Sequence, residues 1–346
     1  MSDGAPHLVP VLANHRFDEA RLADYLAAHL PGFTGPCEVQ QFQGGQSNPT
    51  FRLRTRTRCY VLRKKPPGTL LPSAHAVDRE FRVLRALRGS AVPVPEVLLL
   101  CPDESVIGTM FYVMAYLDGR VFADAALPGV AADARAAIYD DMGRVLAALH
   151  AIDWQAAGLA AFGRPQGYVR RQIERWSQQY AAARLGAEPA MDRLTAWLSA
   201  HAPVAEETAI AHGDFRLGNL LLHATEPRVI GVLDWELATL GHPLADLAYN
   251  CLAWRLPPEL RGIAGLAIAG IPTEDAYVRA YCERTGRDGV PGLPFFIAFS
   301  LFRWSAIAAG VYRRALDGNA ADARGREAGA KFRALAAIGW QVAQQA

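Results

Sequence analysis

Residues 211–223 read AHGDFRLGNLLLH and place an Asp and an Asn in a polar loop beside an apolar run. A second apolar run, VIGVL, ends directly at Asp234. Short apolar runs bounded by polar and turn residues are typical of buried strands. We therefore predict strands over 219–223 and 228–234. Such a strand-loop-strand unit would direct the carboxylates of Asp214 and Asp234 into one cleft.

The spacing of these polar residues fits the needs of phosphoryl transfer from ATP. That reaction requires a carboxylate that accepts the proton of the attacking hydroxyl, and oxygen ligands for Mg²⁺. In the protein-kinase loop H-R-D-x-x-x-x-N the Asn follows the Asp by five positions, as Asn219 follows Asp214 here. Asp234 comes directly after an apolar strand, where the metal-binding Asp of D-F-G would lie. The alternative is that these residues only stabilise turns.

The stretch HGDFRLGNLLLH…VIGVLDWELATLGHPLADLAY resembles the aminoglycoside phosphotransferase-like kinases, which include choline-kinase types. In that family H-G-D and D-x-E/D replace H-R-D and D-F-G. The resemblance covers about residues 35–315 and is closest to the branch related to kinase domains fused to some acyl-CoA dehydrogenases. It implies a bilobal protein-kinase-like fold that binds ATP and Mg²⁺. It also implies that Asp214 is the catalytic base and that Asn219 and Asp234 are the metal ligands.

The same resemblance gives a role to Asp246, which matches a helix-borne Asp that braces the catalytic loop in this family. A carboxylate in the first turn of a helix that begins at Pro243 is an equally good explanation from the sequence alone. His150 ends an apolar helical stretch, and we expect a helix-end or core histidine there.

The bulk composition limits the alternatives. A chain of 346 residues with 51% hydrophobic and 20% charged residues is long enough for two lobes with a sizeable core. The net charge of +2 gives no nucleic-acid footprint. Five dispersed cysteines favour a reducing compartment over disulfides or a zinc site. No signal peptide is recognisable, and we expect a cytoplasmic protein.

Residues 294–312 are the most apolar late stretch of the chain. Arg303 stands in its middle, and a central arginine is costly in lipid. We therefore predict a buried helix and no membrane span. Residues 321–331 read ADARGREAGAK and suggest a polar, flexible segment.

The element pattern predicts an α+β chain with a small N-terminal antiparallel sheet and a larger, mostly helical C-terminal lobe. Helical periodicity over 17–30 is followed by three short strand-like segments, one helix over 77–89 and two further strands. This order suggests a sheet with one helix packed on it. After Asp118 most segments are helical. We place the N-terminal nucleotide-binding lobe at 1–115 and the C-terminal catalytic and acceptor-binding lobe at 116–346.

Three features of the N-terminal lobe are candidates for nucleotide binding. The first is the hairpin turn FQGGQSN, in which Gly44, Gly45 and Ser47 would let backbone N–H groups approach phosphates. An ordinary hairpin has the same composition. The second is the connector YVMAYLDG, where the backbone of Met114 and Ala115 would meet the adenine. A plain strand that ends in an Asp-Gly turn is the alternative.

The third feature is an ion pair. Kinases hold a cation of the third strand against the phosphates with a carboxylate from the next helix. Glu80 lies on the apolar stripe of the helix over 77–89, and an inward carboxylate needs a partner. We choose Arg63, because the resemblance aligns YVLR with the V-A-I-K of kinases. Lys65 remains an alternative cation. Arg63 and Glu80 could instead both be surface residues.

The acceptor is a small molecule with a hydroxyl group. Residues 246–346 carry twelve Arg or Lys against nine Asp or Glu, a net charge of +3, which disfavours a polycationic aminoglycoside. Four arginines could meet a carboxylate or phosphate: Arg255, Arg303, Arg313 and Arg314. With the resemblance, this favours a hydroxy acid or hydroxyacyl-CoA. An aminoglycoside or choline-type kinase, or a kinase-like binding module without turnover, are the alternatives. The oligomeric state is not predicted.

Overall fold

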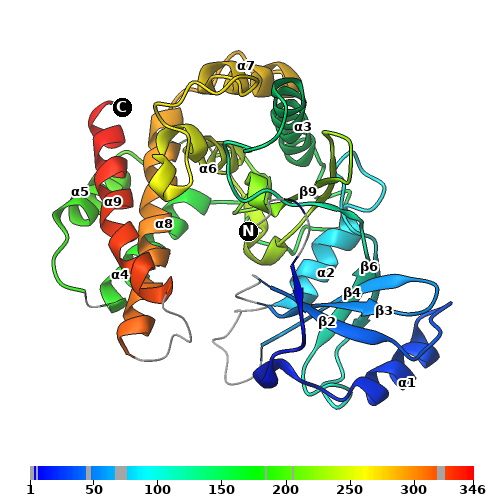
Figure 1. Ribbon diagram of the computed structural model, residues 1–346. Coiled ribbons are helices and arrows are strands. Elements are labelled where there is room, and N and C mark those ends of the chain that lie inside the picture. Colours follow the sequence, from blue (N-terminus) through cyan, green and yellow to red (C-terminus); the bar gives the residue numbers. More distant parts are fainter. Residues whose placement is uncertain are drawn as a thin grey trace. The chain divides into compact units, whose positions relative to one another are not determined.

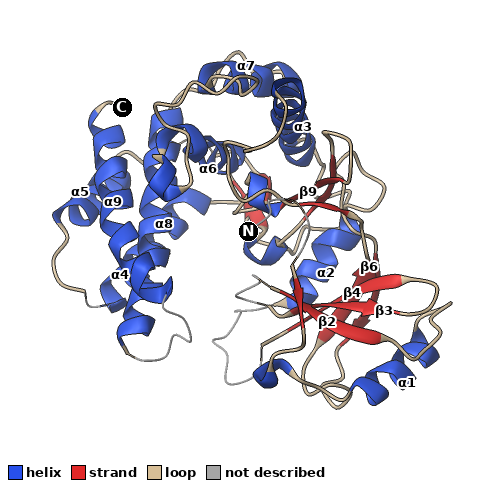
Figure 2. Cartoon of the chain, in the orientation of Figure 1, coloured by secondary structure: helices blue, strands red, loops and turns tan. Residues whose placement is uncertain are grey.

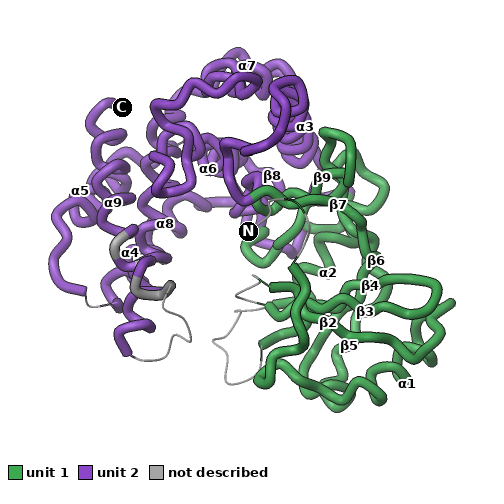
Figure 3. Tube along the Cα trace, in the orientation of Figure 1, with its two compact units in different colours: residues 1–122, 157–159, 218–238 green, residues 123–156, 160–217, 239–346 purple. Residues whose placement is uncertain are grey.

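The protein is described by a computed structural model that covers residue 4 and residues 7–43, 48–66, 76–183, 185–204, 206–317 and 324–346. The chain forms two compact units (Figure 3). Unit 1 comprises residues 1–122, 157–159 and 218–238, and unit 2 comprises the remaining residues, 123–156, 160–217 and 239–346. The boundary at residues 217 and 218 falls inside the short 3₁₀ helix η2 (Leu217–Asn219).

A six-stranded antiparallel sheet forms the centre of unit 1 (Figure 1). Its strand order is β1-β2-β3-β4-β6-β5, and neighbouring strands pair antiparallel throughout. The strands are β1 (Leu8–Val9), β2 (Glu38–Phe42), β3 (Thr50–Arg54), β4 (Cys59–Lys64), β5 (Val97–Cys101) and β6 (Phe111–Ala115). The α+β class expected from the sequence is confirmed.

Side chains alternate between the two faces of this sheet, and a helix covers each face. Leu62 and Val113 point to the face on which α1 (Glu19–His29) packs through Leu22 and Leu26. The opposite face, which carries Tyr112, contacts α2 (Val77–Ala86). The helix predicted to pack on the sheet is α2. A second helix, α1, which lies between β1 and β2 in sequence, packs on the other face.

The two strands predicted after the opening motif form a hairpin in unit 1. They are β9 (Leu220–His223) and β10 (Val229–Val232), which pair antiparallel with Leu220 opposite Val232. A two-residue strand, β7 (Gly119–Arg120), adds to the other edge of β9. A Cβ at Gly119 would lie 2.4 Å from the carbonyl oxygen of Leu222, so this close approach requires glycine.

Unit 2 is mostly helical (Figure 2). Its helices are α3 (Ala132–His150), α4 (Tyr168–Ala183), α5 (Pro189–Ala200), α6 (Pro243–Arg255), α7 (Glu274–Thr285), α8 (Leu293–Leu316) and α9 (Arg324–Gln344). Helix α8 packs against α4, α6 and α9, and α3 packs against α7. The strands β8 (Ala209–Ala211) and β11 (Thr239–Gly241) form a small antiparallel pair. In the described part of the chain, the short helix η4 (Pro258–Leu260) belongs to unit 2, and η1 (Ala13–His15) and η3 (Trp235–Leu237) belong to unit 1.

Two predictions for the C-terminal region have different outcomes. The apolar stretch 294–312 lies in α8, and 72% of the most apolar 18-residue segment of this helix is buried. The prediction of a buried helix is therefore confirmed. By length and composition alone, helix α8 could cross a membrane. This is weak evidence for a membrane span, because a buried core helix has the same length and composition. The prediction of a flexible segment over 321–331 was wrong for 324–331, which begin α9. Alanine, arginine, glutamate and lysine there are good helix formers.

Candidate active site

Arg63 lies at the centre of a charged network in unit 1. It projects from β4, and its Nε atom lies 2.9 Å from Oε2 of Glu80 on α2. Its Nη2 atom donates to Oδ1 of Asp234 at 2.7 Å, and its Nη1 atom donates to the hydroxyl of Thr50 at 3.2 Å. The predicted ion pair between Arg63 and Glu80 is therefore present, and neither side chain is a solvent-exposed surface group.

Glu80 is almost fully buried, with 1% of its surface exposed, and three groups satisfy its carboxylate. Besides the pair with Arg63, its Oε1 atom accepts from Nδ2 of Asn48 at 2.7 Å, and its Oε2 atom accepts from the hydroxyl of Tyr112 at 3.4 Å. A buried carboxylate is stable only when it is paired and hydrogen-bonded. Asn48 and Tyr112 are the partners that sequence reasoning missed. The position of Asn48 next to the Gly-rich turn was the available signal.

The electrostatics of this network keep Arg63 charged. Burial by itself favours the neutral guanidine, but the charges of Glu80 and Asp234 outweigh it and raise the pKa of Arg63 above its usual range. Burial also raises the pKa of the Glu80 carboxyl, and Arg63 opposes this shift. Burial and the nearby Glu80 raise the pKa of Tyr112, so that its hydroxyl stays a donor.

Asn219 and Asp234 lie at the same end of the β9–β10 hairpin. The backbone N–H of Leu233 donates to the carbonyl oxygen of Asn219 at 2.8 Å, one step beyond the pair of Leu220 and Val232. Asp234 follows directly. Asn219 is buried, whereas 35% of the Asp234 side chain is exposed. The hairpin therefore brings Asn219 and Asp234, two residues whose side chains carry oxygen atoms, to the same end of one element.

Asp234 adopts a left-handed backbone conformation, with φ of 65° and ψ of 63°. A non-glycine residue in this region is uncommon, although aspartate is among the residues that tolerate it best. Strained backbone of this kind concentrates at functional sites. The conformation turns the chain from β10 into η3 and leaves the carboxylate beside Arg63.

The loop that carries Asp214 belongs to unit 2, and Asp246 holds its backbone. Oδ2 of Asp246 accepts the N–H of His212 at 2.5 Å, and Oδ1 accepts the N–H of Gly213 at 2.8 Å. The two explanations left open for Asp246 are both correct, because it lies in the first turn of α6 and also braces the loop. Gly213 has a φ of 83°, which explains the glycine that precedes Asp214.

His150 supports this brace. Its Nε2 atom lies 3.6 Å from Oδ2 of Asp246, and its Nδ1 atom is hydrogen-bonded to the hydroxyl of Tyr281 at 2.8 Å. Burial disfavours the Asp246 carboxylate, but His150, His212 and the Gly213 N–H outweigh burial and lower its pKa. His150 is thus a buried helix-end histidine, as expected, and it also pairs with a carboxylate that contacts the loop.

Asp214 itself has charged and polar neighbours in unit 2. Nε of Arg216 lies 3.2 Å from Oδ1 of Asp214. Burial and the nearby Asp214 carboxylate raise the pKa of Tyr249, so its hydroxyl stays protonated. Only 18% of the Asp214 side chain is exposed. The carboxylate is therefore held in a partly enclosed position.

Three of the four arginines proposed for the acceptor have protein partners. Arg255 pairs with Glu274 at 2.7 Å, Arg313 pairs with Asp317, and Arg303 donates to the carbonyl oxygen of Gly213. The expectation that Arg303 faces an acceptor was drawn from charge alone. Charge says nothing about burial, and Arg303 is 6% exposed.

The remaining nucleotide candidates are placed only in part. Gly44, Gly45 and Ser47 lie outside the described residues. Met114 and Ala115 end β6, where Met114 pairs with strands on both sides. The N–H of Ala115 donates to the carbonyl oxygen of Glu96 at 2.8 Å. In this arrangement that N–H is not available to an adenine.

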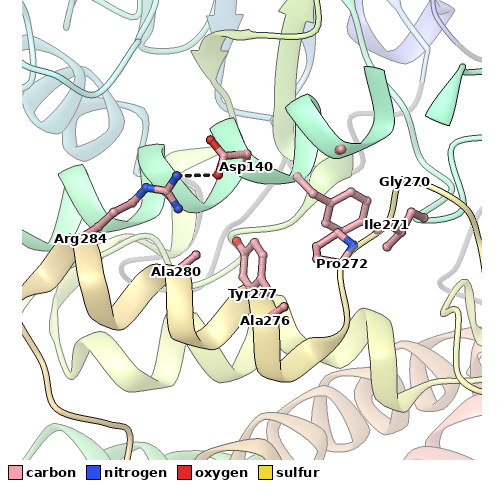
Figure 4. A pocket seen from close by; sticks show the side chains of 10 residues that line it. Asp140, Gly270, Ile271, Pro272, Ala276, Tyr277, Ala280 and Arg284 are labelled. Carbon is pink, nitrogen blue, oxygen red and sulfur yellow. Dashed lines mark hydrogen bonds and ion pairs between the residues drawn. The ribbon is translucent and has the colours of Figure 1, made fainter. Parts of the chain in front are cut away.

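A pocket of about 500 Å³ lies in unit 2 between α3 and α7 (Figure 4). Tyr139 and Tyr277 are among its lining residues, and the ion pair of Asp140 and Arg284, at 2.6 Å, lies at its side. None of the predicted site residues lines it. Among the described residues, no group of three or more His, Cys, Asp or Glu side chains is arranged to hold a metal ion.

Comparison with known proteins identifies the family. The sequence profile of the phosphotransferase enzyme family matches residues 38–293. Acyl-CoA dehydrogenase family member 10 of Mus musculus is 46% identical over 98% of this chain, and family member 11 of Rattus norvegicus is 46% identical over 90%. This chain spans only 32% and 41% of the lengths of those two proteins.

Solved structures show the same fold. A Ralstonia eutropha protein, provisionally named an aminoglycoside phosphotransferase, is 48% identical and has a TM-score of 0.87, with 95% of this chain and 99% of that chain covered. An aminoglycoside 2'-phosphotransferase in complex with GDP is 15% identical with a TM-score of 0.64, over 92% of this chain and 99% of that chain, and it shows the fold alone. The family and these folds together support a small-molecule kinase. The chain belongs to the phosphotransferase enzyme family.

Proposed function

We propose that the protein transfers the γ-phosphoryl group of ATP to the hydroxyl of a small molecule in a Mg²⁺-dependent reaction. The observation that carries the proposal is the double contact of Arg63, which joins Glu80 on α2 to Asp234 at the end of the β9–β10 hairpin. A cation fixed by a helix carboxylate is the arrangement that kinases use on the phosphates. Family membership and the nucleotide-bound neighbour support the same reaction class.

The residues at the hairpin edge fit a magnesium ion. Mg²⁺ prefers oxygen ligands and is usually held by one or two carboxylates together with phosphates and water. Asp234 offers a partly exposed carboxylate, and Asn219 offers an amide oxygen from the adjoining position of the hairpin. We assign both as the metal ligands. Bound there, Mg²⁺ would neutralise negative charge on the phosphates of ATP.

The other proposed roles follow from the chemistry of each side chain. Asp214 accepts the proton of the acceptor hydroxyl while the hydroxyl oxygen attacks the γ-phosphorus of ATP and ADP departs. Arg63 binds the phosphates while Glu80 holds its guanidinium in place. We assign backbone contacts with the nucleotide to Gly44, Gly45 and Ser47, which lie outside the described residues, and to the backbone of Met114 and Ala115 other than the Ala115 N–H. In this scheme residues 1–115 bind the nucleotide, and residues 116–346 supply the base, the metal ligands and the acceptor site.

For the acceptor we propose a hydroxy acid or a hydroxyacyl-CoA thioester. The curated relatives bear the names of acyl-CoA dehydrogenases, enzymes of acyl-CoA chemistry, and the net charge of +3 over residues 246–346 disfavours a polycation. Arg255, Arg303 and Arg313 already have partners within the protein, so they are weaker candidates for binding an anionic acceptor. The names of the relatives are therefore the main support for the proposed acceptor.

The test is a turnover assay with ATP and Mg²⁺ against a panel of 4-hydroxyacyl-CoAs, choline and kanamycin. Phosphorylated product is followed by ³¹P NMR and ADP release by a coupled assay. We expect turnover with a hydroxyacyl-CoA. Turnover with kanamycin alone would reject the proposed acceptor class.

A matched variant separates catalysis from binding. Asp214→Ala should keep Mg²⁺-dependent nucleotide binding, measured by calorimetry, and lose turnover by roughly 10²–10⁴-fold, the usual contribution of a general base. Undiminished turnover in Asp214→Ala would refute its role as the base. Absence of nucleotide binding by the wild-type protein would refute the kinase function altogether.

A further inference from the structure

Gly213, the residue before Asp214, is held at both its N–H and its carbonyl oxygen by helices of unit 2. Asp246 on α6 accepts the N–H of Gly213 at 2.8 Å, and Arg303 on α8 donates its Nη2 hydrogen to the carbonyl oxygen of Gly213. The carbonyl carbon of Gly213 is bonded directly to the nitrogen of Asp214. A contact at this carbonyl therefore fixes the orientation of the peptide plane that Gly213 shares with Asp214, and with it the position of the Asp214 backbone.

The loop is anchored on the other side of Asp214 as well. Nδ2 of Asn250 on α6 donates to the carbonyl oxygen of Phe215 at 3.3 Å. Asp246 and Asn250 are four residues apart and so share one face of α6. Backbone groups on both sides of Asp214 are thus bound by buried side chains, and Arg303 is the one that reaches the loop from α8.

Two aromatic rings lie beside the buried guanidinium of Arg303. Its guanidinium lies 5.8 Å from the ring centroid of Trp176 on α4 and 5.8 Å from that of Tyr249 on α6. Only 6% of the residue is exposed. Packing of a planar guanidinium against aromatic rings is a property of arginine that lysine lacks. The rings therefore aim Nη2 at the Gly213 carbonyl.

Packing alone does not explain an arginine at this position. The Nε atom of Arg303 is buried and has no hydrogen-bond partner among the described residues. A buried donor without a partner is destabilising, and an apolar side chain of similar volume would avoid it. An apolar side chain could fill the space between the rings, but it could not donate the hydrogen bond to Gly213.

We propose that Arg303 is a positioning residue for phosphoryl transfer: it holds the Gly213 carbonyl and thereby places the Asp214 carboxylate for proton acceptance. This inference rests on the proposed function, in which Asp214 is the base. Arg303 acts through Gly213 and takes no proton itself. A misplacement of a reacting group by about 1 Å lowers a rate by on the order of 10²-fold, and this sets the size of effect expected when the contact is lost.

The first experiment is hydrogen–deuterium exchange on wild-type protein, Arg303→Gln and Arg303→Lys, followed in peptides that cover residues 211–219. Arg284→Gln is the matched control, because Arg284 belongs to the same unit and pairs with Asp140 without contacting the loop. We expect residues 211–219 to exchange faster in both Arg303 variants than in wild type. In the control they should exchange at the wild-type rate, and the peptides of α9 should be unchanged in all three variants. Unchanged exchange of the loop in Arg303→Gln would overturn the proposal.

The second experiment measures kcat and KM for the acceptor identified by the turnover panel. We expect kcat to fall on the order of 10²-fold in Arg303→Gln and less in Arg303→Lys, with KM for ATP within about twofold of wild type. Added guanidinium should restore part of kcat to Arg303→Ala, whereas methylammonium at the same concentration should not. A purely structural role would not give selective rescue.

The outcomes separate this inference from the proposed function. A kcat of Arg303→Gln within twofold of wild type, or rescue by both cations alike, would overturn the positioning role while Asp214→Ala still loses turnover. Failure of the proposed function has a different signature, since Asp214→Ala and wild-type protein would then behave alike. The exchange experiment reports on the loop in either case.

Discussion

Nη2 of Arg63 lies 2.7 Å from Oδ1 of Asp234, although 171 residues separate the two along the chain. The same guanidinium pairs with Glu80 through Nε at 2.9 Å. One side chain therefore links β4, α2 and the end of the β9–β10 hairpin. A planar fork of donors can serve two carboxylates at once, which a single ammonium group cannot do in the same geometry.

This relationship predicts unequal effects of substitution at Arg63. Arg63→Met should raise KM for ATP by at least tenfold and lower the free energy of unfolding by about 3–5 kcal/mol, because it leaves Glu80 buried without its partner. Arg63→Lys should lie between this variant and wild type. Urea unfolding and initial-rate kinetics measure the two effects.

Lys65→Met is the comparison for Arg63, since Lys65 was the alternative cation. We expect its KM for ATP to stay within about twofold of wild type. A larger increase in KM for Lys65→Met than for Arg63→Met would move the phosphate-binding role to Lys65.

Asp246→Asn keeps the shape of the side chain but should weaken its hydrogen bonds to the loop that carries Asp214. An amide has only one acceptor oxygen, so its NH₂ group would face one of the two N–H groups that Asp246 now accepts from His212 and Gly213. We expect kcat to fall on the order of tenfold or more and stability by about 3 kcal/mol. Thermal unfolding and turnover are the measurements.

Asp140→Asn serves as the control for this variant, because Asp140 is exposed and pairs with Arg284. It should leave kcat unchanged. A kcat of Asp246→Asn equal to that of Asp140→Asn would show that the brace has no catalytic consequence.

His242 should make the protein less stable in mild acid. Burial, with help from Arg287 and His150, lowers its pKa from 6.5 to about 4, while Glu207 opposes the shift. Its Nδ1 atom accepts the N–H of Leu244 at 3.2 Å, a bond that protonation would remove. The unfolded chain binds a proton more readily than the folded state in this range. The stabilising contribution is therefore complete above pH 6.5 and is lost as the pH falls towards 4.

The magnitude of this effect is on the order of 2 kcal/mol after allowance for solvent screening. His242→Asn keeps a side chain that can cap α6 and should flatten the dependence of unfolding free energy on pH between 6.5 and 4. The exposed His201 provides the control variant, His201→Asn, whose pH profile should match wild type. An unchanged slope in His242→Asn would refute the assignment.

Gly213→Ala should reduce both stability and turnover. The φ of 83° at Gly213 lies in the left-handed region, where a Cβ costs roughly 1–2 kcal/mol. Gly108→Ala is matched to it, with a φ of 81° and open space around the added Cβ. Both variants should lose similar stability in urea unfolding. Only Gly213→Ala should also lower kcat, and equal kcat values for the two would contradict a special role of this peptide.

Gly213 also bears on regulation, because protein kinases have arginine at this position. Without that arginine the loop has no evident docking point for a phosphorylated segment, so we expect activity independent of phosphorylation. Phosphatase treatment of protein purified from its host should leave kcat unchanged. A loss of activity after treatment would contradict this expectation.

The sequence alone determined the reaction class and the local elements. The spacing of Asp214, Asn219 and Asp234 and the apolar runs beside them are local properties, and they predicted the hairpin of β9 and β10 correctly. Periodicity along the chain likewise predicted five of the six strands of the N-terminal sheet, and the two-residue strand β1 was missed. The pair of Arg63 and Glu80 could be predicted because each residue lies in a recognisable local pattern, Arg63 in a strand and Glu80 on the apolar stripe of a helix.

Tertiary structure decided which polar side chains contact one another across long sequence separations. Nothing in the sequence near Arg303 indicates a bond to Gly213, 90 residues away, and charge counting placed this arginine at the acceptor instead. The same holds for Asn48 and Tyr112 around Glu80. A buried polar group takes whichever partner the packing of helices and strands brings within hydrogen-bond distance. That choice depends on three-dimensional neighbours, which local residue patterns do not encode.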